Sequence, residues 1–209
     1  MRPATLTHAS LASAARRLAR EDEDLAAILD RHGPPPLWDR PPGFPTLLHI
    51  ILEQQVSLAS AKALFDRVAC SLSPLTPAAV MAAGEERLKA LGLTRQKAAY
   101  CLHAAGAITE GTLSLPALSR LDDDQALARL QRLKGIGPWS AEIYLLMALR
   151  RADIWPAGDL ALATAMMKVK RLRRRPAPDR LRQMAERWRP FRSVAARMLW
   201  QTYLSGERP

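Results

Sequence analysis

The amino-acid sequence predicts an all-α protein, and three observations support this fold class. Alanine, leucine, arginine and methionine, which favour helices, are abundant, whereas β-branched residues are few. No stretch alternates Val, Ile or Thr with polar residues as a half-buried strand does. A chain of 209 residues can bury one core or two smaller cores that share a cleft. We therefore expect two helical lobes with a central cleft.

The expected helices follow one another with short links that contain proline or glycine. We expect them at 10–20, 24–32, 45–53, 58–71, 77–83, 85–91, 95–109, 123–132, 138–151, 160–171, 178–187 and 193–204. The stretch 33–45 is too rich in proline to be helical, so we expect it to form an extended arm. This arm and the helices before it, residues 1–44, are expected to pack on a body formed by residues 45–209.

Composition places the chain among soluble globular proteins, because 48% of its residues are hydrophobic and 24% are charged. No run of eighteen apolar residues predicts a membrane-spanning helix, and residues 1–13 lack the apolar block of a signal peptide. We therefore expect a cytoplasmic protein without a membrane partner. Cys70 and Cys101 lie among apolar neighbours without metal-site spacing, so we expect both thiols to be buried.

The charge of the chain is basic and uneven. The formal net charge is +11, and residues 168–192 contain eleven Lys or Arg but only two acids, Asp179 and Glu186, which gives this segment +9. Such a cluster favours a polyanionic partner, although a solvated basic face has the same composition. The charge alone leaves these two interpretations open.

The most specific local pattern is LKGIGPWSA at 133–141, which is typical of a helix-hairpin-helix motif. Gly135 and Gly137 allow a sharp turn and a close approach to another chain. Ile136 is expected to pack inward, and Pro138 suits the first turn of the next helix. Free amides at the start of that helix can bind a phosphate without reading the base sequence. An ordinary tight connection with a glycine C-cap is the alternative interpretation.

Two further patterns lie on either side of the hairpin in the sequence. In DIWPAGDL, residues 153–160, Asp159 opens a helix, where a carboxylate caps the first turn. A carboxylate kept ionised there can also stabilise the positive charge that glycosidic cleavage builds on a sugar. In ILEQQVS, residues 51–57, glutamines in a turn between helices can enter a DNA stack in place of an extruded nucleotide. Simple solvent exposure is the alternative for these glutamines.

The order of these patterns, Gln-Gln-Val-Ser, hairpin and Pro-x-x-Asp, resembles the helix-hairpin-helix and Gly/Pro-Asp superfamily of base-excision DNA glycosylases over residues 45–204. Within it the chain is similar to the DNA-3-methyladenine glycosylase II branch. Trp139 stands where bifunctional members carry a Schiff-base lysine, so the resemblance implies no lyase step. No cysteine follows Cys101, so no iron–sulfur cluster is expected. The C-terminal WRPFRS stretch with Trp200 resembles the last helix of the alkylpurine enzymes.

The resemblance also implies roles for individual residues. Asp159 is the expected catalytic carboxylate, and Gln55 is expected to intercalate. The base pocket is expected to include Gln54, Trp139, Ile143 and Trp200. Phosphate contacts are expected from Lys134, Gly135, Gly137 and Ser140. A Na⁺ or K⁺ ion is expected to bind the main-chain carbonyls of Gln131, Leu133 and Ile136. No other cofactor is expected. Two positions depart from the branch, because Gly158 replaces a frequent acid and Ile143 stands at an aromatic position beside Tyr144.

Together these expectations describe a monomeric, monofunctional DNA glycosylase acting on double-stranded DNA. It would flip out alkylated purines of the 3-methyladenine and 7-methylguanine type and hydrolyse their N-glycosidic bond. These bases carry positive charge, which suits indole faces, and they leave readily, so that one carboxylate suffices. The alternatives are a non-catalytic helix-hairpin-helix DNA-binding module, an RNA-binding or nucleoid protein, and a glycosylase for deaminated or mismatched bases.

Overall fold

The structure is a computed structural model that describes residues 4–206. Within this range the chain forms twelve α-helices and no strand beyond one isolated bridge between Thr5 and Arg151, so the all-α prediction is confirmed. The helices are α1 (His8–Glu21), α2 (Glu23–His32), α3 (Phe44–Glu53), α4 (Leu58–Ser71), α5 (Pro77–Ala90), α6 (Arg95–Thr109), α7 (Leu115–Leu118), α8 (Asp123–Gln131), α9 (Pro138–Ile143), α10 (Leu160–Val169), α11 (Pro178–Ala185) and α12 (Arg192–Leu204). A π-helical turn, η1 (Tyr144–Ala148), follows α9, and a 3₁₀ turn, η2 (Glu186–Trp188), follows α11.

Three details differ from the sequence-based expectations, and the break at Gly84 agrees with them. The short helix α7 was not predicted, because it spans only four residues and includes a proline. The helices expected at 77–83 and 85–91 are confirmed, because α5 contains a non-helical residue, Gly84, with φ 67° and ψ 177° at the predicted break. The helix expected at 138–151 changes to π-helical geometry after Ile143. Cys101 is buried but Cys70 is exposed, so the prediction of two buried thiols was wrong for Cys70.

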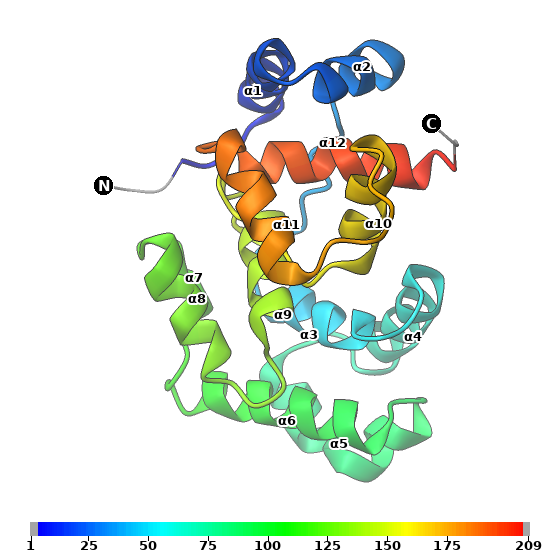
Figure 1. The fold of residues 1–209 in the computed structure, drawn as a ribbon. Helices are drawn as coiled ribbons and strands as arrows, with labels where there is room; N and C mark the ends of the chain where they lie inside the picture. Colours follow the sequence, from blue (N-terminus) through cyan, green and yellow to red (C-terminus); the bar gives the residue numbers. More distant parts are fainter. Residues whose placement is uncertain (1–3, 207–209) are drawn as a thin grey trace. The chain divides into compact units, whose positions relative to one another are not determined.

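The chain divides into two units, drawn together in Figure 1. Unit 1 consists of residues 40–144, which contain α3 to α9. Unit 2 combines residues 4–39 with residues 145–206, so that α1 and α2 fold together with α10, α11 and α12. Unit 2 is therefore assembled from segments that lie far apart in the sequence.

Each unit is built around one helix that is buried on most of its faces. In unit 1 this helix is α3, which contacts α4, α6 and α9 and has eight buried residues of ten. In unit 2 it is α12, which contacts α1, α2 and α10 (Figure 1). A helix that is apolar on all sides must be covered by others. In each unit, the central helix therefore positions the helices that pack against it.

Arg197 on α12 is a charged residue in the middle of the unit 2 core, with a relative exposure of 0%. Its guanidinium donates hydrogen bonds to the carbonyls of Leu37 (2.8 Å), Leu146 (2.9 Å) and Ser193 (3.3 Å). Burial lowers the pKa of Arg197 to about 10, so the side chain is still charged at neutral pH. Arg197 thus ties the proline-rich arm, which carries Leu37, to the C-terminal helix.

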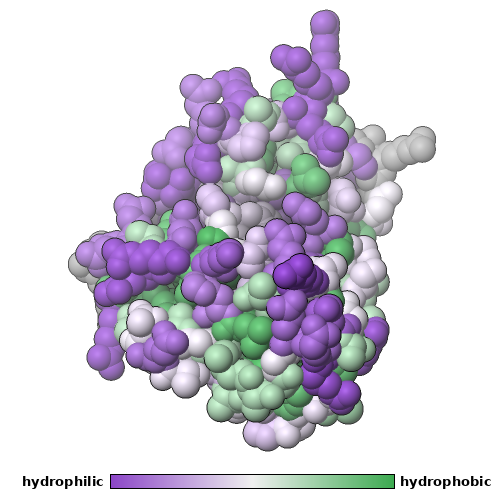
Figure 2. Space-filling model, turned by 90° about the horizontal axis from the view of Figure 1, so that it is seen from below, coloured by the Kyte–Doolittle hydropathy of each residue, from purple (hydrophilic) through white to green (hydrophobic). Residues whose placement is uncertain are grey.

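The surface is mostly polar, in keeping with the composition. On the face drawn in Figure 2, hydrophilic residues occupy most of the area and hydrophobic residues gather in a smaller central part. None of the described helices has the length and the apolar sequence needed to cross a lipid bilayer.

Candidate active site

The hairpin of unit 1 lies between α8 and α9, and its first glycine is required by the fold. Gly135 has a φ of +90°, a conformation that L-residues with a side chain rarely adopt. A Cβ atom at this position would lie 2.2 to 2.5 Å from the ring of Tyr100 on α6. Ile136 packs inward with 3% exposure, as expected, and its N–H donates to the Leu133 carbonyl at 3.0 Å. Close packing against α6 therefore determines the shape of the turn.

The second glycine of the hairpin is different, because the turn does not need it. Gly137 has φ −85° and ψ −178°, which any residue adopts, and a Cβ atom there would meet no atom within 4 Å. It forms the N-cap of α9 and, since glycine has no side chain, makes no side-chain capping bond. The expectation that both glycines make the turn is corrected for Gly137. Its bare Cα leaves open space beside the amides of α9.

The turn after α3 contains the two predicted glutamines, which face different surroundings. The Gln54 amide Nε2 donates to the Gly135 carbonyl at 2.8 Å and to Ser140 Oγ at 2.9 Å. Gln55 is exposed and has a φ of 58°, a left-handed conformation unusual for a residue other than glycine. Gln54 thus fastens the turn to the hairpin, which leaves Gln55 at its exposed tip.

Two side chains on α6, which sequence reasoning did not identify, support this arrangement. Lys97 Nζ donates to the carbonyl of Leu52 at 2.7 Å, near the end of α3, and burial lowers the pKa of Lys97. Tyr100, one helical turn later, packs against Gly135, and its hydroxyl accepts a hydrogen bond from Gln96 Nε2 at 2.7 Å. No local sequence signal distinguishes these residues from other polar residues of an amphipathic helix.

Apolar side chains beside Gln55 were also missed by the sequence analysis. Val56 is 46% exposed and Leu58 is 61% exposed. Exposed apolar residues next to a polar tip are the kind of surface that inserts between bases. The turn from Gln55 to Leu58 therefore has the composition of a DNA wedge.

The remaining predicted residues of unit 1 have varied environments. Trp139 is half-buried in the first turn of α9, and Ile143 is 4% exposed at its end. Tyr144 is fully buried, and its hydroxyl accepts the N–H of Gly43 at 3.1 Å, so it belongs to the core. Lys134 is exposed. Gln131, Leu133 and Ile136, whose carbonyls were assigned to a cation, lie at the end of α8 and in the hairpin; the cation site stays a prediction.

In unit 2, Asp159 is the half-buried N-cap of α10. Its Oδ1 accepts the backbone N–H of Leu162 at 2.7 Å and the indole N–H of Trp200 at 3.1 Å. Two donors on one oxygen fix the orientation of the carboxylate group. The capping role expected from the sequence is present, and Trp200, which is 7% exposed, is in addition a direct hydrogen-bond partner of Asp159.

The loop before Asp159 is tied to the start of α12. The Ser193 hydroxyl accepts the Ile154 N–H at 2.9 Å and donates to the Ile154 carbonyl at 3.0 Å. The carboxylate of Asp153 accepts hydrogen bonds from Arg189 (2.8 Å) and Arg192 (2.9 Å). Since α12 also carries Trp200, one helix positions both the loop and the hydrogen-bond partner of the carboxylate.

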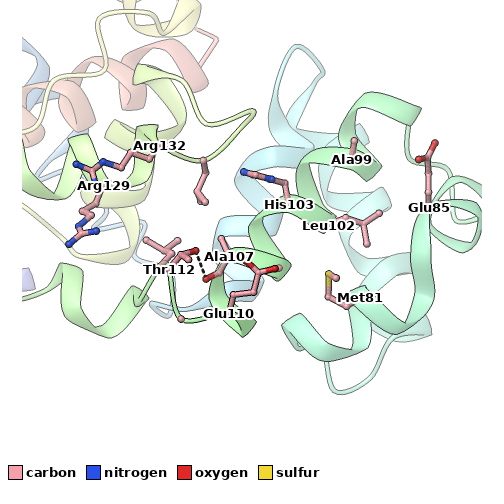
Figure 3. A pocket seen from close by; sticks show the side chains of 14 residues that line it. Met81, Glu85, Ala99, Leu102, His103, Ala107, Glu110, Thr112, Arg129 and Arg132 are labelled. Carbon is pink, nitrogen blue, oxygen red and sulfur yellow. Dashed lines mark hydrogen bonds between the residues drawn. The ribbon is translucent and has the colours of Figure 1, made fainter.

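A groove of about 940 Å³ in unit 1 lies between α5, α6 and the end of α8 (Figure 3). His103 and Leu102 on α6 face Arg129 and Arg132 on the opposite side. Among the predicted site residues, only Leu133 lines it. Because its lining contains no indole and mixes basic side chains with Glu85 and Glu110, this groove does not suit a cationic purine.

Comparison with known proteins assigns the chain to a family. The model of the HhH-GPD superfamily of base excision DNA repair proteins matches residues 48–190, which is more than half of the chain. The chain belongs to the HhH-GPD superfamily. The matched region of this superfamily contains the glutamine turn, the hairpin and Asp159, whereas Trp200 lies beyond it.

The sequence of the chain is also similar to those of individual members of the HhH-GPD superfamily. The chain is 35% identical over 163 residues to DNA-3-methyladenine glycosylase 2 of Escherichia coli, a match that covers 73% of this chain and 55% of that protein. It is 28% identical over 204 residues to DNA-3-methyladenine glycosylase 1 of Schizosaccharomyces pombe, over 92% of this chain and 88% of the relative. The chain thus spans between about half and nine-tenths of these relatives.

A solved structure supports the same assignment. The Schizosaccharomyces pombe 3-methyladenine DNA glycosylase Mag1, in complex with abasic DNA, superimposes with a TM-score of 0.80 at 25% identity, over 91% of this chain and 96% of Mag1. The predicted superfamily and its 3-methyladenine branch are therefore confirmed.

Proposed function

We propose that this chain is a monofunctional DNA-3-methyladenine glycosylase that excises alkylated purines from double-stranded DNA in base excision repair. The observation that carries the proposal is the carboxylate of Asp159, held at the N-terminus of α10 by Leu162 and by the Trp200 indole. The relatives named above support the substrate class, and Mag1 is described in complex with abasic DNA.

Asp159 is suited to stabilise positive charge on a sugar. The C1′–N bond of an alkylated purine breaks with both electrons leaving on the base, which departs as a neutral molecule because the alkylated purine was cationic. The sugar becomes positively charged, and an ionised carboxylate beside it lowers the barrier. Water then forms the new bond to C1′, and its proton passes to Asp159 or to solvent. The good leaving group removes the need for a second acid.

The same residues explain why no strand cleavage is expected. A lyase step requires an amine that forms a Schiff base with the sugar. Position 139 in the hairpin helix carries a tryptophan, whose indole has no nucleophilic amine. The indole of Trp139 is half-buried and offers a face on which a cationic purine can stack, whereas Trp200, at 7% exposure, serves Asp159 as a hydrogen-bond donor. The expected product is therefore an intact strand with an abasic site.

Residues of unit 1 are proposed to hold and distort the DNA. The open space beside Gly137 at the start of α9 suits the close approach of a phosphate, with Lys134 as a neighbouring cation. Gln55, at the tip of its turn and next to exposed Val56 and Leu58, is suited to enter the base stack. Gln54 acts as a positioning residue through its bonds to the hairpin.

The test is base release from methylated DNA in the presence of EDTA, with the freed bases identified by chromatography. Wild-type protein is expected to release 3-methyladenine, and Asp159→Asn to lose at least a hundredfold in single-turnover rate while it still binds an abasic analogue. Gln55→Ala should weaken the fluorescence change of 2-aminopurine placed beside the lesion. Binding without any base release would favour a non-catalytic DNA-binding module, and release of deaminated bases alone would favour the other glycosylase class.

A further inference from the structure

The basic segment 168–192 is divided by the structure into two groups of side chains. In the C-terminal group, four arginines bind acids of the same unit, namely Arg182, Arg187, Arg189 and Arg192, whereas Arg180 donates a hydrogen bond to the side-chain oxygen of Gln183. Arg182 pairs with Asp179 at 3.2 Å, and Arg189 pairs with Glu186 at 2.7 Å. Arg192 pairs with Asp153 at 2.9 Å. These cations stabilise unit 2 itself, so they contribute little free positive charge to a partner.

Lys170 at the end of α10 is also used by the fold. Its ammonium group lies 2.7 Å from a carboxylate oxygen of Asp22 and 2.7 Å from one of Asp24, and 5.7 Å from the ring centre of Trp188. The Lys170 side chain is 15% exposed. It therefore fixes the end of α10 to the start of α2, and the chain that follows begins from a rigid point.

The five residues after Lys170 form a second group with a different character. Four of them are arginines, Arg171, Arg173, Arg174 and Arg175, and all four are exposed. We call residues 171–175 the arginine loop. Across residues 4–206, no hydrogen bond or ion pair of these four side chains is found. The sequence contains no acid between Asp159 and Asp179, so nothing nearby in the chain neutralises the loop.

The backbone of the arginine loop is held in place although its side chains are free. The N–H of Leu172 donates to the Met167 carbonyl at 2.8 Å, and that of Arg171 to the Lys168 carbonyl at 3.2 Å. Pro176 follows directly and restricts the chain further. A loop that is already ordered loses less conformational entropy when a ligand binds.

We infer that the arginine loop is a second phosphate-binding surface, separate from the hairpin, for the DNA backbone that flanks the extruded nucleotide. This inference rests on the proposed function for the choice of DNA as partner. Helix α10, of ten residues, joins Asp159 to the loop and is about 15 Å long. At a rise of about 3.4 Å per base pair, the contacted phosphates lie within roughly five base pairs of the lesion.

The chemistry of the loop suits phosphates. Each guanidinium presents a planar set of donors that can bind two oxygens of one phosphate at once. Each phosphate neutralised in this way adds about 0.9 to the log–log dependence of affinity on salt. Because unit 2 also contains Asp159, the loop and the carboxylate would act on the same DNA molecule. A lesion-free RNA has no extruded nucleotide for Asp159, so the loop and the carboxylate would not act on it together.

The test compares two triple variants of the full chain that have the same net charge. Arg173, Arg174 and Arg175 are changed to Gln in the first variant. Arg16, Arg17 and Arg20 on α1, which are exposed in the same unit, are changed to Gln in the control. Affinity for a duplex with a central abasic analogue is measured by fluorescence anisotropy between 0.05 and 0.2 M salt.

The loop variant should lower the log–log slope by about 2.7, so that the wild type loses about 40-fold more affinity than the variant over this salt range. The control should stay within about 0.5 of the wild-type slope. Two further duplexes are shortened to two base pairs on one side of the lesion, one on the 5′ side and the other on the 3′ side. On one of these two duplexes, the slopes of the wild type and the loop variant should become equal. Equal slopes for both variants, or the same slope change on a lesion-free RNA duplex, would overturn the inference. Base release by the wild type, measured in parallel, decides the proposed function separately.

Discussion

In unit 1, a glutamine amide and a tyrosine ring hold the hairpin in place, whereas in unit 2 ion pairs hold the loop that leads to Asp159. Gln54 and Tyr100 meet the hairpin through neutral hydrogen bonds and close packing. Asp153 and Asp22 in unit 2 each accept hydrogen bonds from cationic side chains. The turns of unit 1 should therefore respond to changes of volume, and the loops of unit 2 to changes of charge.

The difference follows from what each unit presents to its surroundings. Backbone amides and a bare glycine Cα are useful to a phosphate only when no side chain covers them, so packing from behind has to fix their position. A carboxylate that stabilises a sugar cation must stay ionised and correctly oriented, which hydrogen-bond donors achieve. Three experiments test this difference between the two units.

The largest effect is expected at Gly135. Gly135→Ala places a methyl group against the base of the Tyr100 ring and forces a positive φ on alanine, which together cost about 3 kcal/mol of unfolding free energy. The midpoint of thermal unfolding should fall by about 10 °C. Denaturant and thermal unfolding would measure the change.

Gly137→Ala is the matched control, since it adds the same methyl group in the same hairpin. It meets open space at a negative φ, so stability should change by less than about 0.5 kcal/mol. Affinity for DNA should nevertheless fall, because the methyl group occupies the space proposed for the phosphate. A Gly137→Ala protein that unfolds as early as Gly135→Ala would contradict the division of roles between the two glycines.

Most helices could be predicted from the sequence, because their ends carry strong signals. Thr7, Thr76, Thr94 and Asp122 all cap helices that begin within two residues of the predicted starts. The proline-rich arm is likewise non-helical up to Gly43. Helix α3 begins at Phe44, one residue earlier than predicted. The π-helical turn after Ile143 could not be foreseen, because its apolar pattern is that of an ordinary buried helix.

The candidate site was predictable as a list of residues but not as a set of contacts. Asp159 and Trp200 lie 41 positions apart, and no periodicity in the sequence connects them. Lys97 and Tyr100 resemble other polar residues of their helix, so their contacts with Leu52 and Gly135 appear only in the fold. Arg197 would be expected on the surface, since an isolated charged residue is rarely buried.

A smaller effect is expected when unit 2 is acidified. Burial alone would raise the pKa of Asp22, but hydrogen bonds from Lys170 and Trp188 outweigh it, and the pKa lies below its ordinary value of 3.8. As the pH falls, Asp22 is therefore protonated in the unfolded chain before it is protonated in the folded chain. The stabilisation is therefore complete above the unfolded pKa and is lost as the pH falls through the folded pKa.

Asp22→Asn should test this at both ends of the pH range. The variant should be less stable than the wild type by about 2 kcal/mol at pH 7, where the charged carboxylate holds Lys170. The gap should narrow below pH 4 as the wild type loses its advantage. Denaturant unfolding at pH 7, 5, 4 and 3 measures the difference in unfolding free energy between the two proteins. A difference that stays constant down to pH 3 would show that the ion pair does not stabilise unit 2.

The smallest change in stability is expected at Lys97, a partly buried cation of unit 1. Burial lowers its pKa, so the ionised amine is partly disfavoured in the folded chain, and stability rises as the pH increases from the folded pKa towards 10.5. Lys97→Met removes this cost together with the bond to Leu52, and the net change should be within about 1 kcal/mol. If Lys97 positions the glutamine turn, the 2-aminopurine signal beside a lesion should fall several-fold despite this small change, and Lys97→Arg should restore part of it. A full signal in Lys97→Met would mean that the hydrogen bonds of Gln54 hold the turn without a contribution from Lys97.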